Sequence, residues 1–136
     1  KYSLDLTKGI IKGEYATEEE TAQAIKAMYD QTGYVMDTHT AVAYAAYEKY
    51  KNATGDQTKT VIVSTASPYK FTKDVLVSID KKYEAMDFFP LMGELEKLSG
   101  VEMPIPIKGI ESRPILHSTV IERDNIKDFV KEHLTK

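Results

Sequence analysis

The sequence contains no cysteine, so disulfide bonds, thiolate catalysis and cysteine-ligated zinc are excluded within these 136 residues. It has no apolar run near the ~20 residues that a helix needs to cross a bilayer. It also lacks an excess of positive charge, because 18 basic residues stand against 21 acidic ones and the lysines are scattered. We therefore expect neither nucleic acid nor a membrane as a partner, and a reducing, cytoplasmic location.

Glycines are few and lie far apart, so no loop can cradle a phosphate at a helix N-terminus in the usual glycine-rich manner. The seven are Gly9, Gly13, Gly33, Gly55, Gly93, Gly100 and Gly109. The dinucleotide-binding, Walker and GxSxG patterns are absent. His117 and His133 are isolated, without a second ligand four residues away, so the sequence predicts no metal site.

The rest of the composition is that of a globular chain, with 42% hydrophobic and 29% charged residues. Its length suits one domain or a piece of one. The chain begins Lys1-Tyr2-Ser3, which is neither an initiator methionine nor a signal peptide. We interpret it as an excised segment or a mature product.

Apolar periodicity predicts about five helices, over residues 17–33, 37–51, 67–79, 88–99 and 124–134. Thr17 and Glu20 have the spacing of a capping box, in which each side chain satisfies a free backbone amide of the other. Glycines at the ends of the first and fourth helices favour helix termination there. For the last helix we expect a cap at Asp124 and an inward apolar face of Ile126, Phe129, Val130 and Leu134.

Residues 60–64 form a β-branched run without alternation, which is typical of a strand covered on both faces in a parallel sheet. Residues 1–16 and 117–121 are weaker strand candidates. We predict an α/β fold: a helix-rich fragment of a three-layer sandwich with a small, mostly parallel sheet, containing about five helices and one to three strands. Since buried strands need paired neighbours, most of that sheet is expected elsewhere, and an exposed sheet edge would favour self-association.

Three stretches carry a family resemblance. Residues 33–43, GYVMDTHTAVA, resemble the "TGY-x-x-DPHTAVA" stretch of threonine synthases, and residues 64–71, STASPYKF, resemble their "STAHPAKF". Residues 16–21, ATEEET, are similar to their "ATDEET", and the three occur in the family's order at about its spacing. The sequence departs from the family at Thr38, where proline is usual, and at Ser67, where histidine is common.

The resemblance implies that residues 1–136 are the C-terminal segment of a fold-type II pyridoxal-phosphate enzyme: part of the large cofactor domain plus C-terminal helices. The family converts O-phosphohomoserine and water to threonine and phosphate. Its Schiff-base lysine belongs to a motif far upstream, and Lys70 matches a different lysine. We therefore expect the segment alone to bind pyridoxal phosphate weakly or not at all, to be inactive, and to need the remainder of the parent chain as its partner.

Two other functions remain open at this stage. One is a related fold-type II phospho-lyase that acts on another phospho-amino acid. The other is a non-catalytic α/β module that binds a small ligand or a partner.

Two residues are candidates for the site. On the resemblance, the Thr65 hydroxyl lies against the pyridine nitrogen of the cofactor; the alternative is that Thr65 caps helix 67–79. His39, in the first turn of a helix that favours the neutral imidazole, is a candidate pocket residue that relays a proton or orients a carboxylate. Its alternative is a buried, hydrogen-bonded histidine. Asp37 is expected to be a helix cap and Lys70 a solvated helix lysine, while the role of Ser67 stays open.

Overall fold

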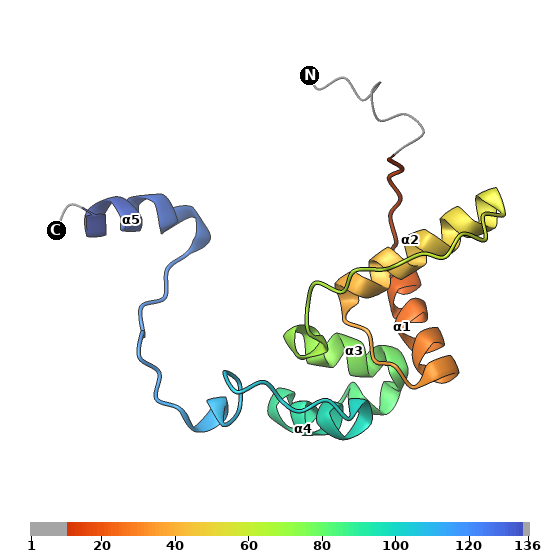
Figure 1. The fold of residues 1–136 in the computed structure, drawn as a ribbon. Helices are drawn as coiled ribbons and strands as arrows, with labels where there is room; N and C mark the ends of the chain where they lie inside the picture. The colour runs from red at the N-terminus through yellow and green to blue at the C-terminus, as the bar shows by residue number, and fades with distance from the viewer. Residues whose placement is uncertain (1–10, 135–136) are drawn as a thin grey trace, which may run out of the picture.

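Four α-helices pack into one body, and a fifth lies apart from it (Figure 1). The computed structural model describes residues 11–134. The α-helices are α1 (Glu18–Thr32), α2 (Thr38–Thr54), α3 (Thr72–Ile79), α4 (Phe88–Ser99) and α5 (Ile126–Leu134). The short 3-10 helices are η2 (Pro68–Phe71), η3 (Lys81–Tyr83), η4 (Ile110–Ser112) and η5 (Arg123–Asn125). The prediction of about five helices is therefore confirmed for the described residues.

The ends of the first helix are confirmed in detail. The Thr17 amide donates to Glu20 Oε2 at 2.7 Å, and the Glu20 amide donates to Thr17 Oγ1 at 3.2 Å, which completes the capping box. Gly33 then adopts φ of 74°, a left-handed conformation that suits glycine, and its amide bonds the Tyr29 carbonyl at 2.8 Å. Local sequence chemistry alone thus determines where α1 begins and ends.

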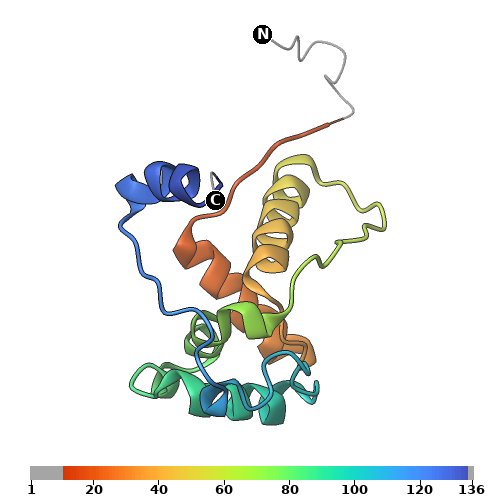
Figure 2. The same ribbon diagram turned by 90° about the vertical axis from the view of Figure 1, so that its left-hand side faces the viewer.

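The core lies around α3, which packs against α1 on one side and α4 on the other (Figure 2). Its largest fully buried apolar side chains are Ile25 of α1, Val75 and Leu76 of α3, and Leu91 and Leu95 of α4. These residues fall at helical spacing in the sequence, so each helix buries one stripe. The α1–α4 body is therefore a packed unit with a core of its own.

The predicted small parallel sheet, and with it the three-layer α/β sandwich, is wrong: residues 11–134 contain no strand. Residues 59–66 instead form an irregular segment that runs back from the C-terminal end of α2 toward its N-terminal end (Figures 1 and 2). Val61 is 87% exposed and Val63 is 71% exposed. A strand forms only where its backbone groups find paired partners, and the described residues offer none.

The other two strand candidates do not form strands in the described residues either. Residues 117–121 are exposed and irregular, with Val120 at 92% exposure. Residues 11–16 have no regular structure, and residues 1–10 lie outside the described part of the chain. Because residues 11–134 contain no sheet edge, the predicted route to self-association has no basis there.

The last helix forms where expected, but its apolar face is not inward. Ile126, Val130 and Leu134 are exposed at 47%, 45% and 80%. Asp124 lies inside η5 and is not the residue that caps it, since that position is Glu122. In Figure 1 the chain after η4 leads α5 away from the other helices. Amphipathic spacing thus predicted the helix correctly and its burial wrongly.

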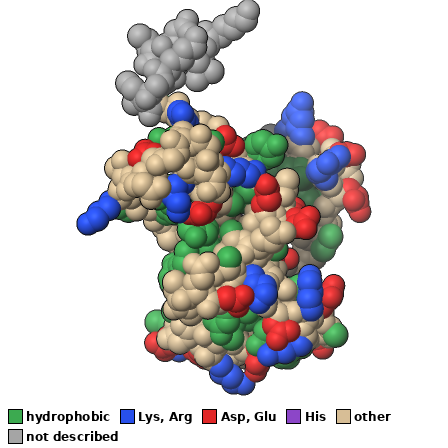
Figure 3. Space-filling view, turned by 90° about the vertical axis from the view of Figure 1, so that its right-hand side faces the viewer, with side chains coloured by type: hydrophobic (Ala, Val, Ile, Leu, Met, Phe, Trp, Pro, Cys, Tyr) green, Lys and Arg blue, Asp and Glu red, His purple; other side chains and the backbone are tan. Residues whose placement is uncertain are grey.

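Charge on the surface is mixed. Figure 3 shows Lys and Arg side chains interspersed with Asp and Glu on the face it displays. Within residues 11–134, no helix has both the length and the apolar content to span a membrane.

Candidate functional site

The N-terminus of α2 is organised by one buried carboxylate. Asp37 is only 2% exposed, and its backbone is extended, as an N-cap requires. Its Oδ1 accepts the amide hydrogens of His39 at 2.9 Å and Thr40 at 3.1 Å. These amides have no partner within the helix, so the predicted cap role of Asp37 is confirmed.

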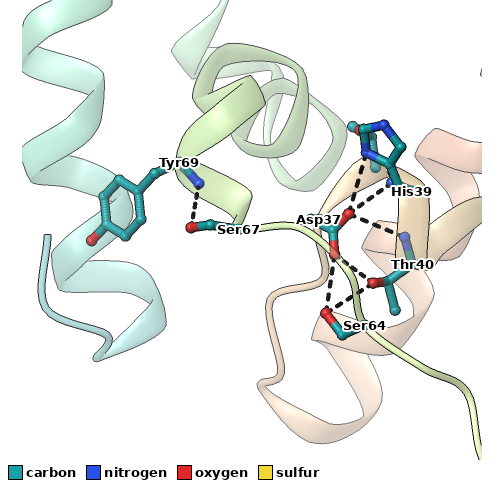
Figure 4. A network of polar contacts seen from close by, with 7 residues as sticks. Asp37, His39, Thr40, Ser64, Ser67 and Tyr69 are labelled. Atoms are coloured by element: carbon teal, nitrogen blue, oxygen red, sulfur yellow. Dashed lines mark hydrogen bonds and ion pairs between the residues drawn. The ribbon is translucent and has the colours of Figure 1, made fainter. Parts of the chain in front are cut away.

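The other carboxylate oxygen faces two hydroxyls (Figure 4). Thr40 Oγ1 donates to Asp37 Oδ2, and Ser64 Oγ lies 3.2 Å from the same oxygen. The two hydroxyl oxygens are themselves 3.0 Å apart. Asp37, Thr40 and Ser64 therefore form a closed cluster between the start of α2 and the irregular segment 59–66.

The cluster keeps Asp37 ionised. Burial raises the pKa of the Asp37 carboxyl. Four hydrogen bonds lower this pKa by more than burial raises it: those from the Thr40 hydroxyl, the Thr40 and His39 amides, and the Ser64 hydroxyl. The net result is a pKa below the ordinary value of 3.8. An ionised carboxylate is acceptor-only, which suits a site that presents four donors.

Thr65 follows Ser64 directly and is exposed. Its hydroxyl makes no hydrogen bond within residues 11–134, and it does not cap the following helix. That role belongs to Ser67, whose Oγ accepts the Tyr69 amide at 3.3 Å. The alternative that Thr65 is a cap is therefore wrong, while its contact with a cofactor stays a prediction.

His39 lies at the surface, with 49% of its side chain exposed, so the alternative of a buried histidine is wrong. Its Nδ1 is 3.5 Å from Asp37 Oδ1, and its ring centroid is 5.6 Å from that of Phe71. Both rings border an open groove of about 290 Å³. Its other lining residues are Ala16, Glu18, Thr21, Thr38, Val42 and Asp74. Since Thr65 is not among them, the structure does not bring the two predicted site residues into one cavity.

Lys70 is exposed, and its Nζ lies 5.5 Å from the centre of the Phe71 ring. This position agrees with a solvated helix lysine. Among residues 11–134, no group of three or more His, Asp or Glu side chains is arranged to hold a metal ion.

Sequence reasoning missed the link between Asp37 and Ser64. The spacing of Asp37 and Thr40 is that of a cap and its third helical residue, so half of the cluster is visible in the sequence. Ser64 lies 27 residues from Asp37, and no local rule connects them. The contact exists only because the chain returns along α2.

Comparison with known proteins places the chain in a family. The family model for "Threonine synthase, C-terminal" matches residues 40–130, more than half of the chain. The chain therefore belongs to the threonine synthase C-terminal family. The matched residues include Thr40, Ser64 and Thr65 and begin just after His39.

Two curated relatives agree with this assignment. The chain is 38% identical over 87 residues to "Threonine synthase 2, chloroplastic" of Arabidopsis thaliana, a match that covers 62% of this chain and 16% of the relative. It is 39% identical over 77 residues to "Threonine synthase" of Schizosaccharomyces pombe, which covers 56% and 15% respectively. The match thus spans about one sixth of each relative. No solved structure matches the chain.

Proposed function

We propose that this chain is part of an enzyme that converts O-phosphohomoserine and water to threonine and phosphate with pyridoxal phosphate. In this proposal, residues 1–136 form part of the large cofactor domain plus C-terminal helices of the parent protein. The observation that carries the proposal is the family match over residues 40–130, which contains the Ser64–Phe71 stretch. The cytoplasm is the location proposed for the enzyme.

The exposed apolar residues support a role as one part of a larger protein. Val61, Val63 and the apolar face of α5 lie in solvent, although such residues are usually buried. The relatives are about six times as long as the region they share with this chain. We therefore propose the remainder of the parent chain as the partner that covers these side chains.

The described residues could supply one contact to the cofactor, at Thr65, but they contain no loop that would hold its phosphate. The four glycines with positive φ, Gly33, Gly55, Gly100 and Gly109, each lie at a helix end, and no two adjoin to make a phosphate cradle. The free hydroxyl of Thr65 can pair with a pyridine nitrogen without fixing the nitrogen's protonation, as a carboxylate would. Pyridoxal phosphate supplies an electron sink for negative charge on the substrate's α-carbon when it is bound.

The decisive experiment uses the full-length protein that carries this sequence. O-Phosphohomoserine is supplied, and released phosphate, threonine and 2-oxobutyrate are measured together. Threonine and phosphate in equal amounts support the proposal. 2-Oxobutyrate instead of threonine would assign a related phospho-lyase, and no turnover, with no upstream lysine motif in the gene, would assign a non-catalytic binding module.

The isolated 136-residue chain gives a second test. We expect it to turn over nothing and to show no new absorbance band when pyridoxal phosphate is added. A new aldimine band, together with a single pyridoxyl-lysine adduct found by mass spectrometry after borohydride reduction, would contradict the proposal, because it would place the reactive lysine inside this chain.

Thr65 is tested in the full-length holoenzyme. Thr65→Val should shift the cofactor absorbance while the helical circular dichroism stays unchanged, because the variant loses only a hydroxyl. Thr60→Val is the matched control, since Thr60 is an exposed threonine of the same stretch whose hydroxyl bonds only the Thr58 carbonyl, at 3.1 Å. Equal spectra for both variants would reject the role of Thr65.

A further inference from the structure

Asp37 is the only buried carboxylate among residues 11–134. A cap on its own does not require such burial, since Thr17 caps α1 from an exposed position. Burial of a charge is costly unless its oxygens are hydrogen-bonded, and here both carboxylate oxygens accept hydrogen bonds. Beyond the two cap contacts, the chain returns to Asp37 at Ser64, whose hydroxyl reaches Asp37 Oδ2 (Figure 4).

The cluster of Asp37, Thr40 and Ser64 contains more oxygen–oxygen contacts than hydroxyl hydrogens to fill them. Three oxygen–oxygen contacts join Asp37 Oδ2, Thr40 Oγ1 and Ser64 Oγ, but the two hydroxyls supply two hydrogens. With Thr40 donating to Asp37, Ser64 donates either to Asp37 or to Thr40. In both arrangements the ionised carboxylate is the final acceptor, so the Ser64 side chain is held against α2 either way.

Ser64 also makes the only hydrogen bonds that join residues 59–66 to the helices, within the described residues. The remaining hydrogen bond of that segment is local, between Thr60 and Thr58. Thr65 is one residue further along, is exposed and makes no hydrogen bond within the described residues. Holding Ser64 against the N-terminus of α2 therefore fixes the backbone that carries Thr65, and with it the direction of the Thr65 side chain.

We infer that Asp37 and Ser64 are positioning residues: the buried carboxylate holds the Ser64 hydroxyl and thereby sets the direction of the Thr65 side chain. The importance of that direction for a cofactor rests on the proposed function. Thr40 supports the same contact by sharing the carboxylate oxygen, and its loss should matter less, because Ser64 can still donate to Asp37 directly.

The test uses the full-length protein with three variants: Ser64→Ala, Ser64→Thr and the control Thr60→Val. Without cofactor, amide hydrogen exchange is followed by mass spectrometry in peptides that cover residues 59–67. Ser64→Ala should raise the exchange rate there about threefold or more, since opening of a segment tracks its local contacts. Peptides of α1 and α3 should be unchanged, which shows that the fold is intact. Ser64→Thr keeps the hydroxyl and should restore slow exchange.

The holoenzyme supplies the second measurement. Ser64→Ala should shift the cofactor absorbance in the same direction as Thr65→Val and by a smaller amount, while Thr60→Val leaves it unchanged. Unchanged exchange in Ser64→Ala would overturn the inference, even if Thr65→Val still shifts the absorbance and supports the proposed function. Faster exchange in Ser64→Ala with no absorbance change in Thr65→Val would uphold the positioning of the segment and reject the cofactor role of Thr65.

Discussion

Two regions of this molecule both contain apolar side chains, but they differ in how far those side chains are buried. In the α1–α4 body, Ile25, Leu76 and Leu91 are at most 1% exposed. In the irregular segment 59–66, Val61 and Val63 are mostly exposed, and Ile126, Val130 and Leu134 of α5 are exposed at 47%, 45% and 80%. The hydrophobic pattern therefore identifies residues suited to burial, whereas burial itself depends on whether a partner surface is present.

The difference between the two regions follows from where each type of secondary structure finds its backbone hydrogen-bond partners. A helix satisfies its backbone hydrogen bonds within itself, so α1, α2 and α4 form from their own caps and stripes. A strand depends on residues outside itself, and none are available to 60–64 within the described chain. If the proposed function is correct, the exposed region is where the chain should respond to the rest of the parent protein, and the α1–α4 body is where it should not.

The largest expected effect tests that contrast directly. Leu76→Ala removes a fully buried side chain at the centre of the body and should lower the free energy of unfolding by about 2–5 kcal/mol. Val61→Ala, at an 87% exposed position, should change it by less than about 0.5 kcal/mol. Urea unfolding followed by helical circular dichroism measures both. A similar loss for the two variants would mean that residues 59–66 are packed.

The next largest effect on stability is expected at the contact between the α1–α4 body and segment 59–66, where Asp37 meets Ser64. Asp37→Ala removes the cap of α2 and the acceptor of two hydroxyls, and should lower the free energy of unfolding by about 2 kcal/mol. Ser64→Ala removes only the long-range hydroxyl and should lower it by about 1 kcal/mol or less. Equal losses would assign the stabilisation to the long-range contact rather than to the helix cap.

The same carboxylate makes a pH prediction. Since the folded-state pKa of Asp37 lies below 3.8, its stabilising contribution is complete above that pH and is lost as the pH falls through the folded-state pKa. The free energy of unfolding should therefore fall less between pH 5 and pH 2 in Asp37→Asn than in the unaltered chain. Asp124→Asn, which removes a carboxylate at an exposed residue, is the matched control.

Sequence reasoning succeeded where chemistry is local. The capping box at Thr17, the Asp37 cap and the glycine after α4 were all predicted and are all confirmed. It failed for residues 60–64 and for the inward face of α5, because both predictions assumed a partner surface that the described residues do not contain. Of the candidate site, the cap was predictable from spacing, while the contact of Ser64 with Asp37 depends on the path of the chain.

A smaller effect on the free energy of unfolding is expected from glycine substitutions in α4, with opposite signs at the end and in the interior of the helix. Gly100 follows α4 with φ of 66°, and no atom would touch an added Cβ, so Gly100→Ala should cost about 1 kcal/mol from backbone strain alone. Gly93 lies inside α4, also with open space around it, so Gly93→Ala should stabilise by about 0.5–1 kcal/mol. Opposite signs in urea unfolding confirm this reasoning, and a loss in both variants would contradict it.

Truncating the exposed apolar side chains of α5 should have the smallest effect on the stability of the isolated chain and a larger effect on that of the full-length protein. Val130 and Leu134 lie on the exposed face of α5, so Val130→Ala and Leu134→Ala should each change the stability of this chain by less than about 0.5 kcal/mol. If the remainder of the parent covers that face, the same substitutions should cost about 1–3 kcal/mol in the full-length protein, because buried methyl groups are then lost. His133→Ala, whose ring stacks on Phe129 of the same helix, is a control for effects within α5. A negligible loss in the full-length protein would mean that this face of α5 stays exposed there too.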